Sequence, residues 1–138
     1  MQTKYESIEM KSPLSIISDF VVLSPDKKAN TEHFNSGLYE RLNAKYNGFA
    51  GHELISCHEF TSDWTSWEVH PYGDEIVVLL SGTTTFLLKI EGDEVRVILS
   101  YLGQYVIVPK GVWHTAKTQD YVKLLFITPG QDTQNKAI

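Results

Sequence analysis

The chain has 138 residues and a formal net charge of −5 at neutral pH, and 42% of its residues are hydrophobic. This length and composition predict a single globular domain, because disordered chains are poorer in apolar residues. The acidic balance argues against nucleic acid and against anionic membrane surfaces as partners, since both attract clusters of lysine and arginine.

The compartment is indicated by what the sequence lacks. Cys57 is the only cysteine, so the chain cannot form an internal disulfide, and there is no Asn-x-Ser/Thr site for glycosylation. The stretch from Met1 to Met10 is polar and lacks the apolar core of a secretory signal. No run approaches the roughly 20 apolar residues that cross a bilayer. We therefore expect a cytoplasmic protein with no membrane partner.

The first 30 residues give few regular signals. Residues 1–15 are expected to be irregular, because Pro13 interrupts any regular element. Ile16 to Leu23 is extended in composition and is expected to form an outer strand. Ser24-Pro25-Asp26 follows and is typical of a turn.

One helix is predicted, from about Thr31 to Tyr46. Phe34, Leu38 and Leu42 recur every four residues and would form one apolar stripe on its surface. Asn30 or Thr31 would act as the N-cap. We expect this helix to pack on the domain that follows.

After Gly51 the apolar pattern changes to a period of two. Short runs rich in Val, Ile, Thr and aromatic residues alternate with Gly, Asp and Pro turns, which is typical of strands in a sandwich or a closed barrel. The predicted strands are 52–60, 65–71, 75–81, 83–90, 94–100, 105–109, 113–118 and 121–128. Residues after Pro129 are polar and are expected to form a loose tail.

Some of these strands are apolar on both faces. Ile76, Val78 and Leu80 fall on one face of the 75–81 strand, and Val77 and Leu79 fall on the other. A strand with two apolar faces is covered on both sides, so one face needs a second layer outside the barrel. A homodimer is our preferred explanation for part of that layer. Along the 105–109 strand the pattern leaves open which pair lines the interior, Tyr105 and Ile107 or Val106 and Val108.

Two histidines and two glutamates are placed to share one inward surface. Glu68 and His70 point to the same face of a strand, Pro71 and Gly73 then turn the chain, and Glu75 opens the next strand. Far downstream, the turn around Gly111 delivers His114 at the start of another strand. Imidazoles and carboxylates in this combination suit a divalent metal ion.

Two segments resemble the sequence motifs of the cupin superfamily. His70, a four-residue gap, Glu75, and six residues before Gly82 follow the pattern of the first motif. Gly103, five residues, Pro109, one residue, Gly111, and two residues before His114 follow the pattern of the second motif. The resemblance implies an all-β double-stranded β-helix, the jelly-roll barrel, over residues 51–130. It would be preceded by an N-terminal extension with one helix at 1–50 and followed by a polar tail at 131–138.

The resemblance also implies a metal site at His70, Glu75 and His114, but the sequence departs from the family pattern. Glu68 stands where the family usually has a further histidine, and Thr118 stands where it often has an asparagine. Glu68 would be a fourth ligand, a general base beside the metal, or the sign of a site that has lost its metal and holds an organic ligand. If metal is bound, Fe, Mn, Ni and Zn are the candidates.

The remaining histidines, tryptophans and the cysteine are expected to be structural. His33, His52 and His58 lie outside both motifs and are assigned surface or structural roles, although His52 and His58 share a strand face that could reach the cavity. Strand alternation turns Trp67 and Trp113 away from the cavity. Cys57 is expected to be a buried apolar group.

The function expected from this pattern is a small barrel that binds a divalent metal ion and a small organic ligand. Cupins of this kind include metal-dependent oxygenases and isomerases, and the resemblance does not choose between them. The alternative is a metal-free barrel that binds a small molecule without catalysis, which the glutamate at position 68 favours. The sequence assigns no catalytic residue.

Overall fold

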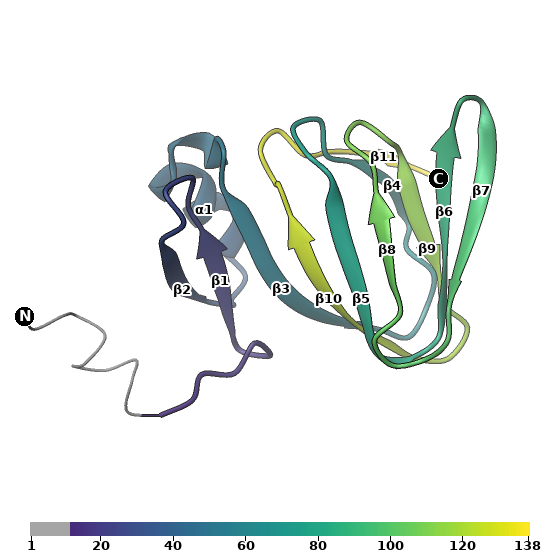
Figure 1. The fold of residues 1–138 in the computed structure, drawn as a ribbon, viewed down its shortest axis with the longest axis horizontal. Helices are drawn as coiled ribbons and strands as arrows, with labels where there is room; N and C mark the ends of the chain where they lie inside the picture. The colour runs from purple at the N-terminus through teal and green to yellow at the C-terminus, as the bar shows by residue number, and fades with distance from the viewer. Residues whose placement is uncertain (1–11) are drawn as a thin grey trace, which may run out of the picture.

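The computed structural model describes residues 12–138, which form two antiparallel β-sheets facing each other, with one α-helix beside them (Figure 1). The six-stranded sheet has the order β2-β1-β3-β10-β5-β8, and the five-stranded sheet has the order β11-β4-β9-β6-β7. The elements are β1 (Asp19–Leu23), β2 (Ala29–His33), α1 (Leu38–Lys45), a 3-10 turn (Asn47–Phe49), β3 (Glu53–Phe60), β4 (Ser66–Val69), β5 (Glu75–Gly82), β6 (Thr84–Ile90), β7 (Asp93–Leu99), β8 (Tyr105–Val108), β9 (His114–Lys117), β10 (Val122–Thr128) and β11 (Gln134–Ala137).

The expected all-β jelly roll is confirmed, and each of the eight strands predicted after Gly51 is present with its ends moved by a few residues. Alternation explains why they were recognisable: along β5, Val77 and Leu79 are fully buried, whereas Ile76 and Val78 are only half-buried. On β8 it is Val106 and Val108 that face the interior. The main core lies between the two sheets and is built from such inward-facing side chains.

The predicted helix is wrong in its first half. Residues 29–33 form β2, which pairs with β1 in a hairpin closed by the expected turn around Pro25. The helix begins only at Leu38, and Gly37 caps it without a side-chain hydrogen bond. Phe34 fitted the apolar stripe, but it stacks on Phe20 of β1 with ring centroids 4.9 Å apart.

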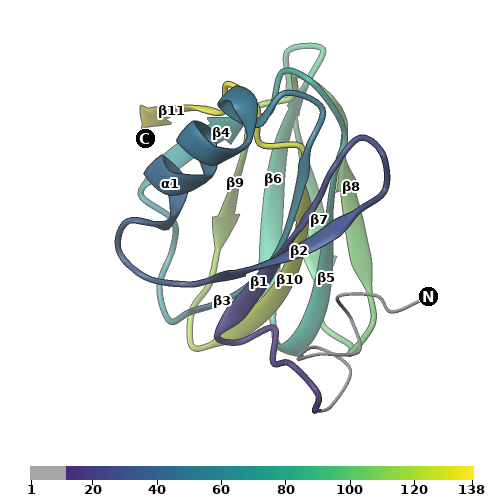
Figure 2. The same cartoon turned by 90° about the vertical axis from the view of Figure 1, so that its left-hand side faces the viewer.

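Helix α1 packs against the inner face of the sheet extension that β1, β2 and β3 form (Figure 2). Leu38 and Leu42 are buried there with Phe20 and Val22. Glu32 of β2 is also buried, and it holds the helix end through Lys45 Nζ at 2.7 Å. Among residues 12–138, no helix has the length and apolar character needed to span a membrane.

The tail is a strand, contrary to the sequence-based expectation of a loose end. Gln134–Ala137 form β11, which pairs antiparallel with β4, although its side chains are exposed. The missing apolar alternation is the reason that the pattern did not reveal it. The expected irregular stretch 1–15 lies largely outside the described residues, and residues 12–15 belong to no helix or strand. The domain boundaries near residues 50 and 130 stay predictions.

The backbone geometry at Gly82, the last residue of the first motif, explains why this position is a glycine. Its φ is +81°, and a Cβ atom there would lie 2.1 Å from the carbonyl oxygen of Tyr121. Only glycine fits such a left-handed position against a neighbouring backbone. The motif glycine therefore marks the close approach of β5 to the start of β10.

Candidate metal centre

Both sheets contribute to one cluster of four polar side chains inside the barrel. Glu68 lies on β4, His70 directly follows that strand, and His114 begins β9, all on the five-stranded sheet. Glu75 begins β5 of the opposite sheet. Because Glu68 and His114 are direct partners across β4 and β9, the strand pairing itself brings two of the four together.

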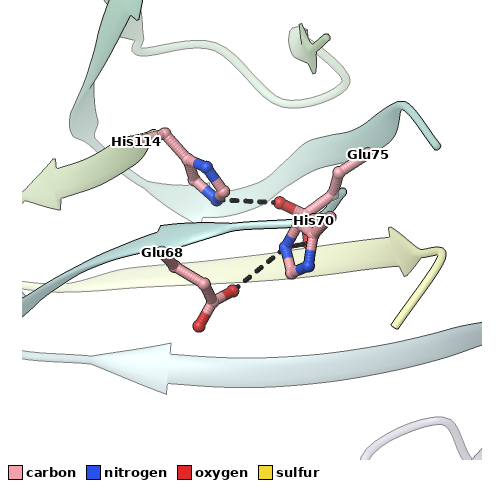
Figure 3. Close-up of side chains that lie close together, drawn as sticks. All are labelled: Glu68, His70, Glu75 and His114. Carbon is pink, nitrogen blue, oxygen red and sulfur yellow. Dashed lines mark ion pairs between the residues drawn. The ribbon is translucent and has the colours of Figure 1, made fainter. Parts of the chain in front are cut away.

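The donor atoms of these residues converge on a small volume (Figure 3). One ligand atom from each of the four lies within 4.8 Å of the others. His70 Nε2 is 3.1 Å from Glu68 Oε1 and 3.3 Å from Glu75 Oε2, and His114 Nε2 is 3.1 Å from Glu75 Oε1. The side chains of His70, Glu75 and His114 are at most 3% exposed, whereas Glu68 is 29% exposed.

These short contacts are not hydrogen bonds. Within residues 12–138, His70 Nε2, Glu75 Oε1 and His114 Nε2 are buried and have no hydrogen-bond partner. The nitrogen–oxygen distances are short enough for hydrogen bonds, but the groups are not aligned for them. A buried polar atom without a partner is costly, and a bound ion is one of its ordinary explanations.

Hydrogen-bond partners of the two Nδ1 atoms determine the tautomer of each imidazole. The Thr133 hydroxyl donates to the Gly130 carbonyl at 3.0 Å, so its oxygen is left to accept a hydrogen bond from His70 Nδ1 at 2.9 Å. His114 Nδ1 lies 3.2 Å from the Val112 carbonyl, which can only accept. Both rings therefore carry a proton on Nδ1, and a neutral ring offers the lone pair of Nε2 to the cluster.

The same neighbours set the charge of the cluster. Burial by itself would lower the pKa of His70, but the carboxylates of Glu68 and Glu75 outweigh it and raise the pKa to about 9. Burial works to raise the pKa of Glu75, but the His114 and His70 imidazoles outweigh it and hold the pKa at about 2. Glu75 also accepts a hydrogen bond from the Thr128 hydroxyl at 2.6 Å. Glu75 is therefore ionised at neutral pH, and His70 carries a proton when no metal is present.

A cavity of about 940 Å³ opens in front of the cluster. Glu68, His70 and Glu75 form part of its wall, and helix α1 contributes another part through Tyr39 and Leu42. Aromatic rings from β3, β10 and the segment after β3 line a further part, together with small polar side chains. A volume of this size accommodates a small organic molecule beside the four polar side chains.

Three other predictions about side chains can be judged against this cavity. Trp67 and Trp113 do not line it, as alternation predicted, and a lysine ammonium group covers each ring at 4.3 Å and 4.4 Å. Trp64 does line it. Cys57 is buried, as expected.

The remaining histidines have diverse surroundings. His33 is exposed, on β2 rather than on a helix, and His52 Nδ1 contacts the Ala50 carbonyl oxygen at 2.8 Å. His58 is the one of the three that lines the cavity, where its Nε2 lies 3.2 Å from the Tyr39 hydroxyl. Burial lowers the pKa of His58 despite the opposing effect of Glu68, so the ring is neutral and accepts from Tyr39.

Sequence reasoning missed the residues that support the cluster from behind. Thr128 and Thr133 carry no motif, and Thr133 stands in the segment expected to be loose. Only their hydrogen bonds to Glu75 and His70 reveal them. Thr118, which replaces the family's asparagine, is buried and contacts the Thr84 hydroxyl at 3.0 Å instead of the cluster.

Comparison with known proteins gives matches among solved structures alone. No protein-family model matches the chain, and no curated protein does. A cupin-2 domain containing protein from Shewanella frigidimarina is 21% identical, with 56% of this chain and 70% of that chain covered and a TM-score of 0.47. A cupin superfamily protein from Desulfitobacterium hafniense is 22% identical, with 55% and 65% covered and a TM-score of 0.47. Hydroquinone 1,2-dioxygenase from Sphingomonas sp. is 16% identical, with 55% and 58% covered and a TM-score of 0.46.

The fold assignment rests on this chain's own architecture. Two antiparallel sheets enclose the core, and His70 and Glu75 of the first motif meet His114 of the second between them. Glycines of both motifs, Gly82, Gly103 and Gly111, have positive φ angles, which explains why glycine stands there. The chain therefore has the fold of the cupin superfamily.

Proposed function

We propose that Glu68, His70, Glu75 and His114 bind one divalent metal ion. Two observations carry the proposal: His70 Nε2, Glu75 Oε1 and His114 Nε2 are buried without a hydrogen-bond partner, and the imidazole nitrogens of the cluster lie 3.1 to 3.3 Å from its carboxylate oxygens. Two ligand atoms that are each about 2.1 Å from a shared ion lie about 3.0 Å apart at a right angle and about 3.4 Å apart at the tetrahedral angle. The three nitrogen–oxygen contacts therefore have the spacing of neighbouring ligands of one ion, and all four residues offer ligand atoms within 4.8 Å of one another.

The donor set narrows the choice of ion. Two imidazole nitrogens and two carboxylate oxygens suit borderline divalent ions, so we propose Fe, Mn, Ni or Zn. The two carboxylates balance the charge of such an ion. Metal uptake would displace the proton of His70, so the affinity should increase as the pH rises toward 9, the pKa of that imidazole in the metal-free protein.

The cavity in front of the cluster supports a second component, a small organic ligand. A metal ion held at the cluster would polarise a carbonyl or enolate oxygen or support oxygen chemistry, which are the reactions of cupin isomerases and oxygenases. Glu68 is the most exposed of the four side chains and borders the cavity, so it is the residue nearest to a bound ligand. A metal-free barrel that binds the ligand without catalysis is the alternative.

The metal proposal is tested by titrating Zn²⁺ and Mn²⁺ into metal-free protein and into its His114 variants. His114→Ala and His114→Gln should each lose at least about 100-fold in affinity, because a buried ligand is removed. The glutamine variant guards against a folding defect from the lost ring volume. His33→Ala, which changes an exposed histidine outside the cluster, should bind as the wild type does. Wild-type affinity in both His114 variants would refute the assignment.

We also propose that the chain forms a homodimer through the outer face of β5, β8 and β10. Ile76 and Val78 are half-buried on this face, while Tyr105 and Ile107 beside them are 61% and 50% exposed. Contiguous exposed apolar residues of this kind mark interaction surfaces.

A cytoplasmic location is a further proposal, supported by the single cysteine, which is buried.

A further inference from the structure

The cavity in front of the cluster has a one-sided charge. Of its lining residues in the described part of the chain, five are acidic and none is lysine or arginine. Glu68 and Glu75 belong to the cluster, while Glu40, Asp63 and Asp132 are exposed residues of the wall. A cavity that takes a carboxylate or phosphate needs a free cationic partner for it. The one cationic group on this wall, the protonated His70 of the metal-free protein, is already paired with Glu68 and Glu75 at 3.1 Å and 3.3 Å.

The cationic side chains of helix α1 do not line the cavity and are paired with a carboxylate elsewhere. Glu40 and Asn43 of α1 line the cavity, but Arg41 and Lys45 lie on another side of the same helix and contact Glu32 at 3.4 Å and 2.7 Å. Lys117 is 3.8 Å from Asp63 and offsets that carboxylate. Among residues 12–138, neither Glu40 nor Asp132 has an ion-pair partner. Their charges therefore remain available to a ligand.

Another part of the wall is aromatic. Phe60, Trp64 and Phe126 form a continuous group with ring centroids 5.5 to 6.4 Å apart, and His58 lies 5.8 Å from Phe126. Aromatic faces attract planar apolar groups and also cations, and they repel anions. The rings and the carboxylates thus favour the same kind of ligand.

We propose that the cavity selects uncharged or cationic planar molecules that carry a hydroxyl or carbonyl oxygen, and that it rejects anions. The role of the oxygen, to reach the four-residue cluster, rests on the proposed function; the charge preference rests on the cavity wall alone. An anion entering here would lose its hydration beside several carboxylates and gain no unpaired cationic partner, because His70 is paired with Glu68 and Glu75. A neutral ring loses little hydration, and an ammonium group gains the exposed carboxylates of Glu40 and Asp132.

Three phenols of matched shape test this selection. Tyramine, tyrosol and 3-(4-hydroxyphenyl)propionate share a phenol ring and a two-carbon arm, and at neutral pH they carry charges of about +1, 0 and −1 respectively. Their dissociation constants are measured by ligand-observed NMR on the metal-free protein and again on the Zn²⁺-loaded protein. In the metal-free form, tyramine and tyrosol should bind at least about tenfold more tightly than the propionate. Equal or tighter binding of the propionate, or binding of none of the three, overturns the inference.

Substitutions of the acidic lining residues test whether they cause the charge preference of the cavity. The double variant Glu40→Gln/Asp132→Asn should reduce the advantage of tyramine over the propionate at least about threefold, whereas Glu94→Gln, an exposed change on β7 outside the cavity, should leave it unchanged. An unchanged advantage in the double variant contradicts the assigned cause.

The two proposals fail separately in these measurements. If the charge order holds in the metal-free protein but Zn²⁺ does not bind, the metal proposal is wrong and the ligand inference stands. If Zn²⁺ binds but the propionate is preferred in the metal-free form, the ligand inference alone is wrong.

Discussion

Glu68 stands where the cupin pattern usually has a histidine, and its carboxylate lies 3.1 Å from His70 Nε2. The exchange of an imidazole for a carboxylate changes the donor set to two nitrogens and two oxygens and adds one negative charge. The spacing of the motifs could reveal His70, Glu75 and His114, but it could not say whether the substituted residue still reaches the cluster. The structure places its oxygen among the other donors.

The role of Glu68 is tested by two substitutions. If its carboxylate is a ligand, Glu68→Gln should weaken metal binding about 10- to 100-fold, because an amide oxygen is a poor donor without charge. Glu68→His should restore binding and shift the preference from Mn²⁺ toward Zn²⁺ or Ni²⁺. Competition with a chromogenic chelator measures both. Undiminished affinity in the glutamine variant would make Glu68 a group that faces the organic ligand rather than the ion.

At the scale of elements, strand β11 shows how an inconspicuous segment supports the cluster. It pairs with β4 along four residues, and Thr133 just before it holds His70 through Nδ1. Its sequence has no apolar alternation because its side chains are exposed, so no pattern could reveal it. Backbone pairing, which leaves no trace in side-chain type, is what orders this strand.

Thr133→Val tests that support. Valine has nearly the same shape but no acceptor, so the Nδ1 proton of His70 would be buried without a partner and the ring would lose its orientation. Metal affinity should fall about 10- to 100-fold, while Thr133→Ser should stay within a few-fold of the wild type. Isothermal titration calorimetry gives both values, and equal affinity in all three proteins would show that Thr133 does not position the ring.

The helix is shorter than the sequence predicts, for the opposite reason to β11. Its first residues have a helical apolar pattern, but strand pairing in the folded chain overrides that pattern. Phe34, Leu38 and Leu42 have helical spacing, yet the preceding residues 29–33 pair with β1 along the whole strand. Glu32, which lies within the predicted helix, is a buried strand residue that binds Lys45. The barrel strands were predictable because each has one buried face, whereas β2 has a mostly polar sequence.

At the scale of the whole molecule, the outer face of the six-stranded sheet predicts the oligomeric state. Val78→Asp introduces a charge at the centre of this apolar face and should convert a dimer into a monomer in multi-angle light scattering, with metal affinity unchanged. Thr85→Asp, a half-buried position on β6 of the other sheet, is the matched control and should stay dimeric. A wild-type chain that is monomeric at micromolar concentration contradicts the proposed interface.

The central claim is that two imidazoles and two carboxylates from both sheets hold one metal ion inside this barrel. Elemental analysis of protein purified without a histidine tag or chelator tests it most directly. The account predicts about one equivalent of Fe, Mn, Ni or Zn per chain, and none in His114→Ala. A wild-type protein that contains no metal, and takes none up when soaked with these ions, would contradict it.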